Sequence, residues 1–174
     1  MRQARPVRRG LLGSLAAALL PGLWAWPARA LDAPTGKVIL TITGTLAHSN
    51  DNGSAAFDLA LLQKLPQHSF STRTPWYPQP RKFSGVLLRD LLAAVGSQAV
   101  TLKAVALNDY RVDIPAEDLT QHGAMLAYLL DDSPMPVREK GPLVIIYPFD
   151  DHPELRNAVR FSRAIWQLRT IELK

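Results

Sequence analysis

Three short segments carry the side chains with which this protein can bind or convert a ligand. Arg73-Thr74-Pro75-Trp76 combines a guanidinium, a hydroxyl and an indole ring, and Asn108-Asp109-Tyr110 adds an amide, a carboxylate and a phenol. Arg138 and Lys140 place two cations shortly before Gly141. Guanidinium and ammonium groups bind oxyanions, and indole faces stack on flat rings. The residue types therefore favour a small, planar, anionic ligand, and we expect Arg73, Trp76 and Tyr110 to converge on one pocket.

Other reactive side chains are spaced less favourably. The loop Asp150-Asp151-His152-Pro153-Glu154 offers oxygen ligands to a cation, but it lacks the glycine spacing of a calcium loop, so a solvated loop is the favoured interpretation. Ser71 and Ser162 lack the G-x-S-x-G setting of a hydrolase nucleophile, which is weak evidence against a triad because triads assemble in space. The other histidines stand in separate loops without a partner cysteine and predict no zinc site. They are His48, His68 and His122.

A helix followed by a β-hairpin must position the central segment. A helix capped by Ser84 and ended by Gly96 is predicted by apolar residues at i, i+3, i+4 and i+7. These residues are Leu88, Leu91, Leu92 and Val95. The nearly continuous apolar run Val100 to Leu107 is typical of a central strand covered on both faces. Asn108-Asp109 then predicts a turn, and the alternation from Tyr110 to Ile114 predicts the second strand of a hairpin.

The rest of the chain reads as strands, loops and short helices, which together indicate a strand-rich α+β domain without a linker. Between Gln67 and Lys82 we find no strand or helix period, and three prolines predict an extended loop that either binds a ligand or merely covers the core. The other predicted elements are a strand at 37–44, a helix from Ser54 to Leu65, a strand at 125–130 with a turn at 131–134, a buried strand at 143–148, a helix near 155–161 and a last strand at 164–173.

The first thirty residues are typical of an export signal. Arginines precede the apolar run Leu11 to Trp26, and Ala28-Arg29-Ala30 fits the small-x-small cleavage pattern. We therefore expect residues 1–30 to be a cleaved signal peptide and residues 31–174 to be a single periplasmic domain. An uncleaved anchor is the alternative, and Arg8-Arg9 leaves open whether export follows the general or the twin-arginine route.

The leader also carries the whole charge excess. The full chain has 20 basic and 15 acidic residues, and five of the arginines lie in the first thirty residues. The expected mature domain is neutral, which gives no support for nucleic acid or an anionic membrane as a partner. The chain has no Cys, so its core alone must hold the domain. We expect no membrane span once the signal is removed.

The order of several short blocks resembles the molybdopterin-binding domain of the sulfite oxidase family. The blocks are Gly85-x-x-Leu88-x-x-Leu91-Leu92, Tyr110 ahead of Ile114-Pro115, Leu126-Ala127-Tyr128, Pro134-Met135-Pro136, Gly141-Pro142, an apolar strand ending at Pro148, and Trp166. The resemblance covers roughly Val38 to Leu173, and no single block is specific by itself. It implies an enzyme that moves an oxygen atom or electrons at a molybdenum, which a pterin dithiolene and one Cys thiolate hold.

This chain departs from that pattern where the metal would be held. The resemblance places the family's Cys near Ser71 to Thr74, where none of the residues supplies soft sulfur. Val144 and Ile165 stand where the family commonly has Arg and Lys, so basic groups for the cofactor phosphate or substrate are missing. Tyr110 matches the family's active-site Tyr. The resemblance thus implies the fold and a pocket more strongly than redox chemistry.

We therefore expect an α+β domain with the sulfite-oxidase-like molybdopterin-binding fold that acts without redox catalysis, as a ligand-binding or signalling-accessory module. We expect no cofactor, with molybdopterin as the alternative, and a small anionic or pterin-like ligand or a membrane signalling or redox protein as partner. The predicted ligand-binding residues are Arg73, Thr74, Trp76, Asn108, Asp109, Tyr110, Arg138 and Lys140. One rival is a molybdopterin-dependent oxidoreductase with an oxygen of Ser71 or Thr72 on the metal. The other is an assembly subunit anchored by Trp76 and Tyr77.

Overall fold

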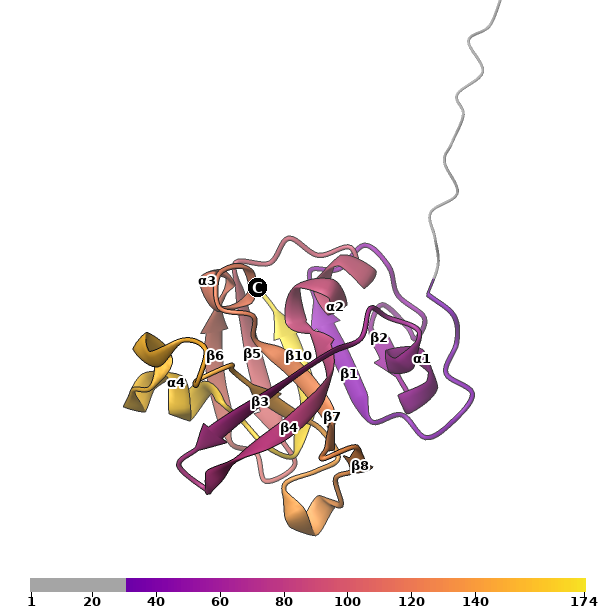
Figure 1. The fold of residues 1–174 in the computed structure, drawn as a ribbon. Helices are drawn as coiled ribbons and strands as arrows, with labels where there is room; N and C mark the ends of the chain where they lie inside the picture. The colour runs from indigo at the N-terminus through magenta and orange to yellow at the C-terminus, as the bar shows by residue number, and fades with distance from the viewer. Residues whose placement is uncertain (1–30) are drawn as a thin grey trace, which may run out of the picture.

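Two β-sheets with short helices around them make up residues 31–174, the part of the chain that the computed structural model describes (Figure 1). The first sheet has the order β2 (Ala55–Phe57), β1 (Leu40–Gly44), β10 (Leu168–Leu173), β5 (Thr101–Ala106) and β6 (Arg111–Pro115). The second has the order β3 (His68–Thr74), β4 (Tyr77–Leu87), β7 (Met125–Leu130) and β8 (Ser133–Pro134), and β9 (Val144–Ile146) also pairs with β7. The predicted signal peptide, residues 1–30, lies outside the described residues.

Short helical segments connect the strands. They are α1 (Leu59–Gln63), α2 (Leu88–Ala94), α3 (Ala116–Thr120) and α4 (Ala158–Arg163), with the 3₁₀ turns η1 (Val137–Glu139) and η2 (Pro153–Leu155). Among the described residues, no helix has the length and apolar character needed to cross a membrane. The predicted α+β class is confirmed.

One hydrophobic cluster joins the two sheets. It includes Leu40 of β1, Val86 of β4 and Leu126 of β7, none of which exposes any surface. β4 and β7 approach closely at Gly85, where a Cβ atom would overlap the carbonyl oxygen of Leu126. A glycine is therefore required at this position, since any side chain would push the two strands apart.

The apolar stripe of α2 is confirmed, but its predicted start is wrong. The four stripe residues are all buried: Leu88, Leu91, Leu92 and Val95. Ser84 lies inside β4, where it pairs with Ser69 of β3 and Leu129 of β7, so the sheet occupies the position expected to cap the helix. α2 instead begins after Leu87 without a side-chain cap. Gly96, at φ 64°, follows its end as predicted.

The hairpin of β5 and β6 is confirmed. β5 pairs with β10 on one side and with β6 on the other, and Asp109 takes φ 63° in the connecting turn. Two details are wrong, because β5 begins at Thr101 and Val100 is 70% exposed. Lys103 is also only half-buried, so the first half of β5 is covered on one face rather than on both.

The segment from Gln67 to Lys82, predicted as an extended loop, forms most of the β3–β4 hairpin instead. Pro78 and Pro80 misled the prediction because proline usually interrupts a sheet. Both lie in β4 before Phe83, the first β4 residue paired with β7. The missing N–H groups therefore remove no bond to β7.

The segment after Ser54 also differs from the prediction. Ala55–Phe57 is a strand, and α1 begins only after Asp58. The carboxylate of Asp58 accepts the N–H of Leu61 at 2.8 Å and binds the N–H groups of Thr35 and Gly36 at 2.8 and 2.7 Å. Asp58 is thus the true N-cap, and it also ties the start of the described chain to α1.

Later elements follow the prediction more closely. β7 coincides with the predicted strand, and Asp131 and Asp132 turn the chain with positive φ. β9 and β10 are shorter than the strands predicted around them. α4 starts at Ala158, because the side chain of Asn157 accepts the N–H of Arg160 and caps the helix there.

Candidate functional site

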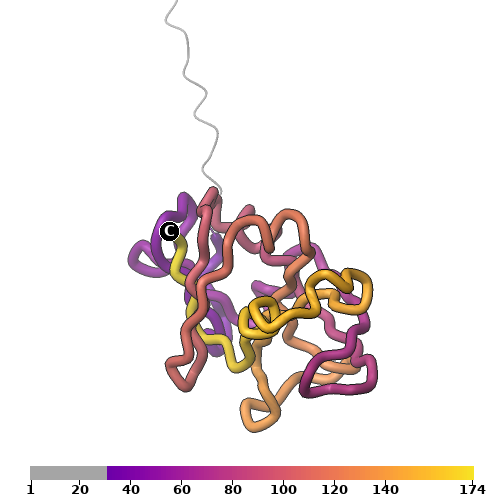
Figure 2. Tube along the Cα trace, turned by 90° about the vertical axis from the view of Figure 1, so that its left-hand side faces the viewer, coloured from indigo at the N-terminus to yellow at the C-terminus, as the bar shows by residue number. Residues whose placement is uncertain are grey.

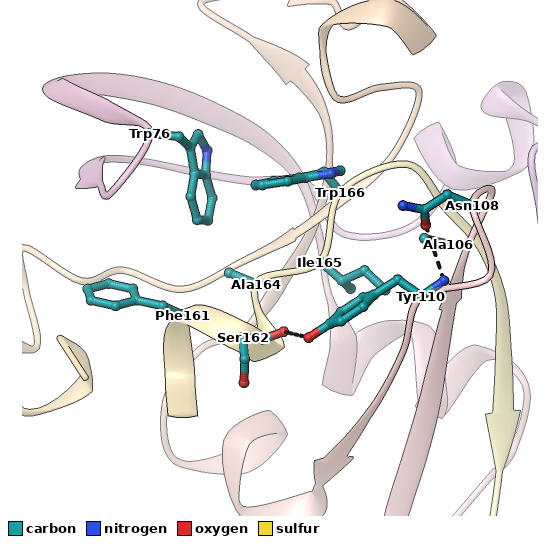
Figure 3. A pocket seen from close by; sticks show the side chains of 9 residues that line it. All are labelled: Trp76, Ala106, Asn108, Tyr110, Phe161, Ser162, Ala164, Ile165 and Trp166. Carbon is teal, nitrogen blue, oxygen red and sulfur yellow. Dashed lines mark hydrogen bonds between the residues drawn. The ribbon is translucent and has the colours of Figure 1, made fainter. Parts of the chain in front are cut away.

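A cavity of about 250 Å³ opens where three segments distant in sequence meet. These are the tip of the β3–β4 hairpin, the turn between β5 and β6, and the chain from α4 into β10 (Figures 2 and 3). In Figure 2 the segment with α4 crosses the face toward the viewer, with the β5–β6 hairpin to its left and the β3–β4 hairpin to its lower right. We call this the aromatic cavity. Its walls are Trp76, Ala106, Asn108, Tyr110, Phe161, Ser162, Ala164, Ile165 and Trp166.

Four of the nine wall residues are aromatic, and Figure 3 shows their rings around the cavity: Trp76, Tyr110, Phe161 and Trp166. The indoles of Trp76 and Trp166 meet edge to face, with ring centroids 5.0 Å apart and planes at 86°. The backbone of Trp166 forms an antiparallel bridge to Val144, the first residue of β9. The ammonium of Lys140 lies 4.9 Å from the ring centroid of Trp166, at cation–π distance. Two perpendicular indoles with a cation beside one of them create a rigid surface for a flat ring.

Few polar groups face this cavity, and hydrogen bonds within the protein already occupy some of their atoms. The hydroxyl of Tyr110 donates to the carbonyl of Ser162 at 3.1 Å, which leaves its oxygen free to accept. The carbonyl oxygen of the Asn108 side chain accepts the N–H of Tyr110 at 3.1 Å, so its NH₂ group remains available as a donor. Among the described residues, no charged side chain lines the cavity.

The structure brings together only part of the predicted set. Trp76, Asn108 and Tyr110 line the aromatic cavity, and Lys140 lies beside it against Trp166. The expected convergence of Arg73 with Trp76 and Tyr110 is wrong. Side chains alternate between the two sides of a strand, and Arg73 is exposed between the buried Thr72 and Thr74 of β3. Its guanidinium pairs with the carboxylate of Asp150 at 3.2 Å instead.

Three further predicted residues also lie outside the wall. Thr74 is buried, and its hydroxyl accepts the N–H of Tyr77 at 2.9 Å. The carboxylate of Asp109 pairs with Arg169 at 3.1 Å. Arg138, with 84% of its side chain exposed, is 3.6 Å from the carboxylate of Glu139. Their side chains close turns or face solvent rather than the cavity.

Sequence reasoning missed two aromatic and polar contributors. Phe161 and Ser162 belong to α4. The helix predicted near 155–161 ended at Phe161, and neither residue was assigned to a pocket. Trp166 was noticed only through the family resemblance, although it makes a large part of the wall. All three come from a segment without a clear period, so no local pattern pointed to the cavity.

The segment where the resemblance places the metal-binding Cys offers no ligand that fits molybdenum. The buried hydroxyl of Thr72 accepts the N–H of Asp150 at 3.1 Å and donates to the carbonyl of Arg73 at 3.3 Å. Thr74 is engaged with Tyr77, and Ser71 is exposed. The buried oxygens therefore already hold the β3–β4 hairpin in shape, and the chain contains no soft sulfur from Cys. These residues do not fit the family's metal centre.

Comparison with known proteins agrees with the fold. The family model described as "Oxidoreductase molybdopterin binding domain" matches residues 40–149. Among solved structures, the sulfane dehydrogenase SoxCD from Paracoccus pantotrophus is similar, with a TM-score of 0.56 and 16% sequence identity. The similarity covers 77% of this chain but only 37% of that chain, and at this identity it shows the fold alone. A comparison with curated proteins found no match. The family match extends over more than half of the sequence, and the chain therefore belongs to the oxidoreductase molybdopterin binding domain family.

Proposed function

We propose that this protein is an exported module that binds a small planar ligand in the aromatic cavity and carries out no redox catalysis. The observation that carries the proposal is the meeting of Trp76, Tyr110 and Trp166, which come from three separate segments and face one cavity. Cavities with apolar walls and a few convergent polar groups are the usual form of small-molecule sites. The volume, about 250 Å³, suits a ligand of one or two rings.

The ligand class follows from the groups at the cavity. The indole faces favour a flat ring, the Asn108 amide supplies a donor, and the Tyr110 oxygen supplies an acceptor. A positive charge lies at its edge, where Lys140 lies against Trp166. A small anionic or pterin-like molecule meets these conditions when its ring enters the cavity and its anionic group stays near Lys140.

Tryptophan fluorescence tests this binding directly. After residue 30 the chain has only two tryptophans, Trp76 and Trp166, and both line the aromatic cavity. Titration with pterin-6-carboxylate should quench their emission saturably. Lys140→Gln should weaken that binding while leaving the affinity for uncharged pterin unchanged, because only the anionic probe uses the ammonium. Absence of saturable quenching by both probes would overturn the proposed ligand class.

The loss of redox catalysis is supported by the absence of a fitting metal ligand around Thr72 and by apolar residues at Val144 and Ile165. Metal analysis and an absorbance spectrum of protein purified from its native compartment test it. We expect no stoichiometric molybdenum. One molybdenum per chain would favour the rival oxidoreductase, and Ser71→Ala and Thr72→Val variants would then identify an oxygen ligand.

Export and a signalling-accessory role complete the proposal. The apolar leader with its Ala28-Arg29-Ala30 pattern supports export to the periplasm. Cell fractionation with N-terminal sequencing should find a periplasmic protein that begins at Leu31. Recovery of the full-length chain in the membrane fraction would replace the secreted module with an anchored one.

A further inference from the structure

A second cavity, of about 510 Å³, lies on the other side of α4. Phe161 and Ser162 of this helix face the aromatic cavity, whereas Val159, Arg160 and Arg163 face the second one. We call it the Asp118 cavity, after the buried carboxylate that holds its two arginines. Its lining residues are Pro115, Glu117, His122, Glu154, Leu155, Asn157, Val159, Arg160 and Arg163.

Asp118 lies behind the cavity wall and forms ion pairs with its two arginines. It exposes none of its side chain, and one of its oxygens accepts the hydroxyl of Tyr147 at 2.9 Å and the guanidinium of Arg163 at 3.0 Å. The other oxygen forms an ion pair with Arg160. Burial raises the pKa of Tyr147, and the neighbouring carboxylate raises it further, so the hydroxyl stays protonated and donates. One carboxylate therefore faces two guanidinium groups, which leaves one positive charge in excess.

The excess charge is held where a ligand can reach it. The side chains of Arg160 and Arg163 are only 16% and 19% exposed. Within residues 31–174, neither guanidinium makes a side-chain contact to an acid other than Asp118. Buried charges are costly unless they are paired, and two fixed guanidinium groups side by side match the oxygens of a carboxylate.

The rim of the same cavity is acidic. Glu117 and Glu154 both line it, and each is more than half exposed. Their nearest partners are histidines: His122 lies 3.8 Å from Glu117, and His152 lies 3.2 Å from Glu154. A plain anion would be repelled by these two carboxylates, but a ligand that also carries an ammonium group would be attracted by them.

We propose that the Asp118 cavity binds the zwitterion of a small α-amino acid. The carboxylate of the ligand lies against Arg160 and Arg163, and its ammonium group lies toward Glu117 and Glu154. A short apolar side chain then packs against Val159, which is otherwise an exposed apolar residue. The site is separate from the aromatic cavity, so the proposal stands whether or not that cavity binds a planar ligand.

Isothermal titration of the purified protein with three probes tests the zwitterion directly. L-Alanine carries both charges, propionate carries only the carboxylate and ethylamine only the ammonium group. We expect saturable binding of L-alanine and binding at least about fivefold weaker for each of the other two probes, since each loses one set of charge contacts. No saturable heat with L-alanine, or equal affinity for propionate, would overturn the proposal.

Variants at the rim separate ligand contacts from folding. Glu154→Gln leaves Asp118 and its arginines untouched, so it should weaken L-alanine about three- to fivefold and leave the melting temperature unchanged. Arg169→Gln is the matched control, because its guanidinium pairs with Asp109 outside the cavity. If Glu154→Gln and Arg169→Gln bind L-alanine equally well, the ammonium end of the site is wrongly assigned. Arg163→Gln should abolish binding, and its melting curve shows whether the variant is still folded.

Discussion

Replacing Asp118 by Asn is the most demanding test of the structure away from any ligand. The substitution keeps the shape of the side chain and removes its charge, which leaves the mostly covered guanidinium groups of Arg160 and Arg163 without their anion. Loss of one partner from a buried ion pair costs about 3–5 kcal/mol of unfolding free energy. Two guanidinium groups depend on this carboxylate, so we expect a loss of about 4 kcal/mol or more.

Urea unfolding followed by circular dichroism measures this loss. With a denaturant slope of about 2 kcal/mol/M, the midpoint should fall by about 2 M. Asp109→Asn is the control, because Asp109 is 69% exposed and its pair with Arg169 is a surface contact, worth less than about 1 kcal/mol. Asn also tolerates the positive φ of that turn. If the two variants unfold at the same urea concentration, the buried ion network does not hold α4 in the way we describe.

Four further predictions concern single side chains. Leu91→Ala should cost about 2–5 kcal/mol because Leu91 is fully buried, whereas Arg89→Ala on the exposed face of α2 should cost less than about 1 kcal/mol; equal urea midpoints would contradict the helical phase. Tyr147→Phe removes one hydrogen bond to Asp118 and should lower unfolding free energy by about 1–2 kcal/mol in the same assay. Backbone N–H groups of Leu61 and Gly36 hold the pKa of Asp58 below its usual range, so its stabilisation is present above about pH 4 and is lost as the pH falls further; Asp58→Asn should flatten thermal melting against pH in that acidic range. Tyr110→Phe should weaken pterin-6-carboxylate about three- to tenfold with little change in melting, while Tyr128→Phe, outside the aromatic cavity, should leave the affinity unchanged.

Local periodicity explains which parts of the fold were predictable. The buried stripe of α2 was predicted from its i, i+3, i+4 spacing, and the β5–β6 hairpin from the turn residues Asn108-Asp109. Both patterns involve residues close together in sequence. The β3–β4 hairpin was missed because a strand tolerates a proline only where no neighbouring strand needs the missing N–H group. Pro78 and Pro80 are tolerated where β7 does not yet pair with β4, and this partner lies about fifty residues away in sequence.

The same limit applies to the site. Asn108 and Tyr110 were found because a turn places its residues at the end of a sheet, and this position can be read locally. Arg73 was misplaced because its partner is Asp150, 77 residues further along the chain. The Asp118 network escaped notice for a similar reason. Asp118 lies 45 residues before Arg163 in sequence, and no motif joins the carboxylate to Arg160 and Arg163.

The position of α4 between the two cavities has a thermodynamic consequence. One face of this short helix carries Phe161 and Ser162, and another carries Arg160 and Arg163, so a displacement of the helix changes both cavities at once. Ser162 also accepts the hydroxyl of Tyr110, which extends any such displacement to the β5–β6 turn. Linkage between two binding sites is reciprocal. If a ligand in one cavity shifts α4, each ligand changes the affinity of the protein for the other by the same factor. A single small domain would then respond to the two ligands jointly.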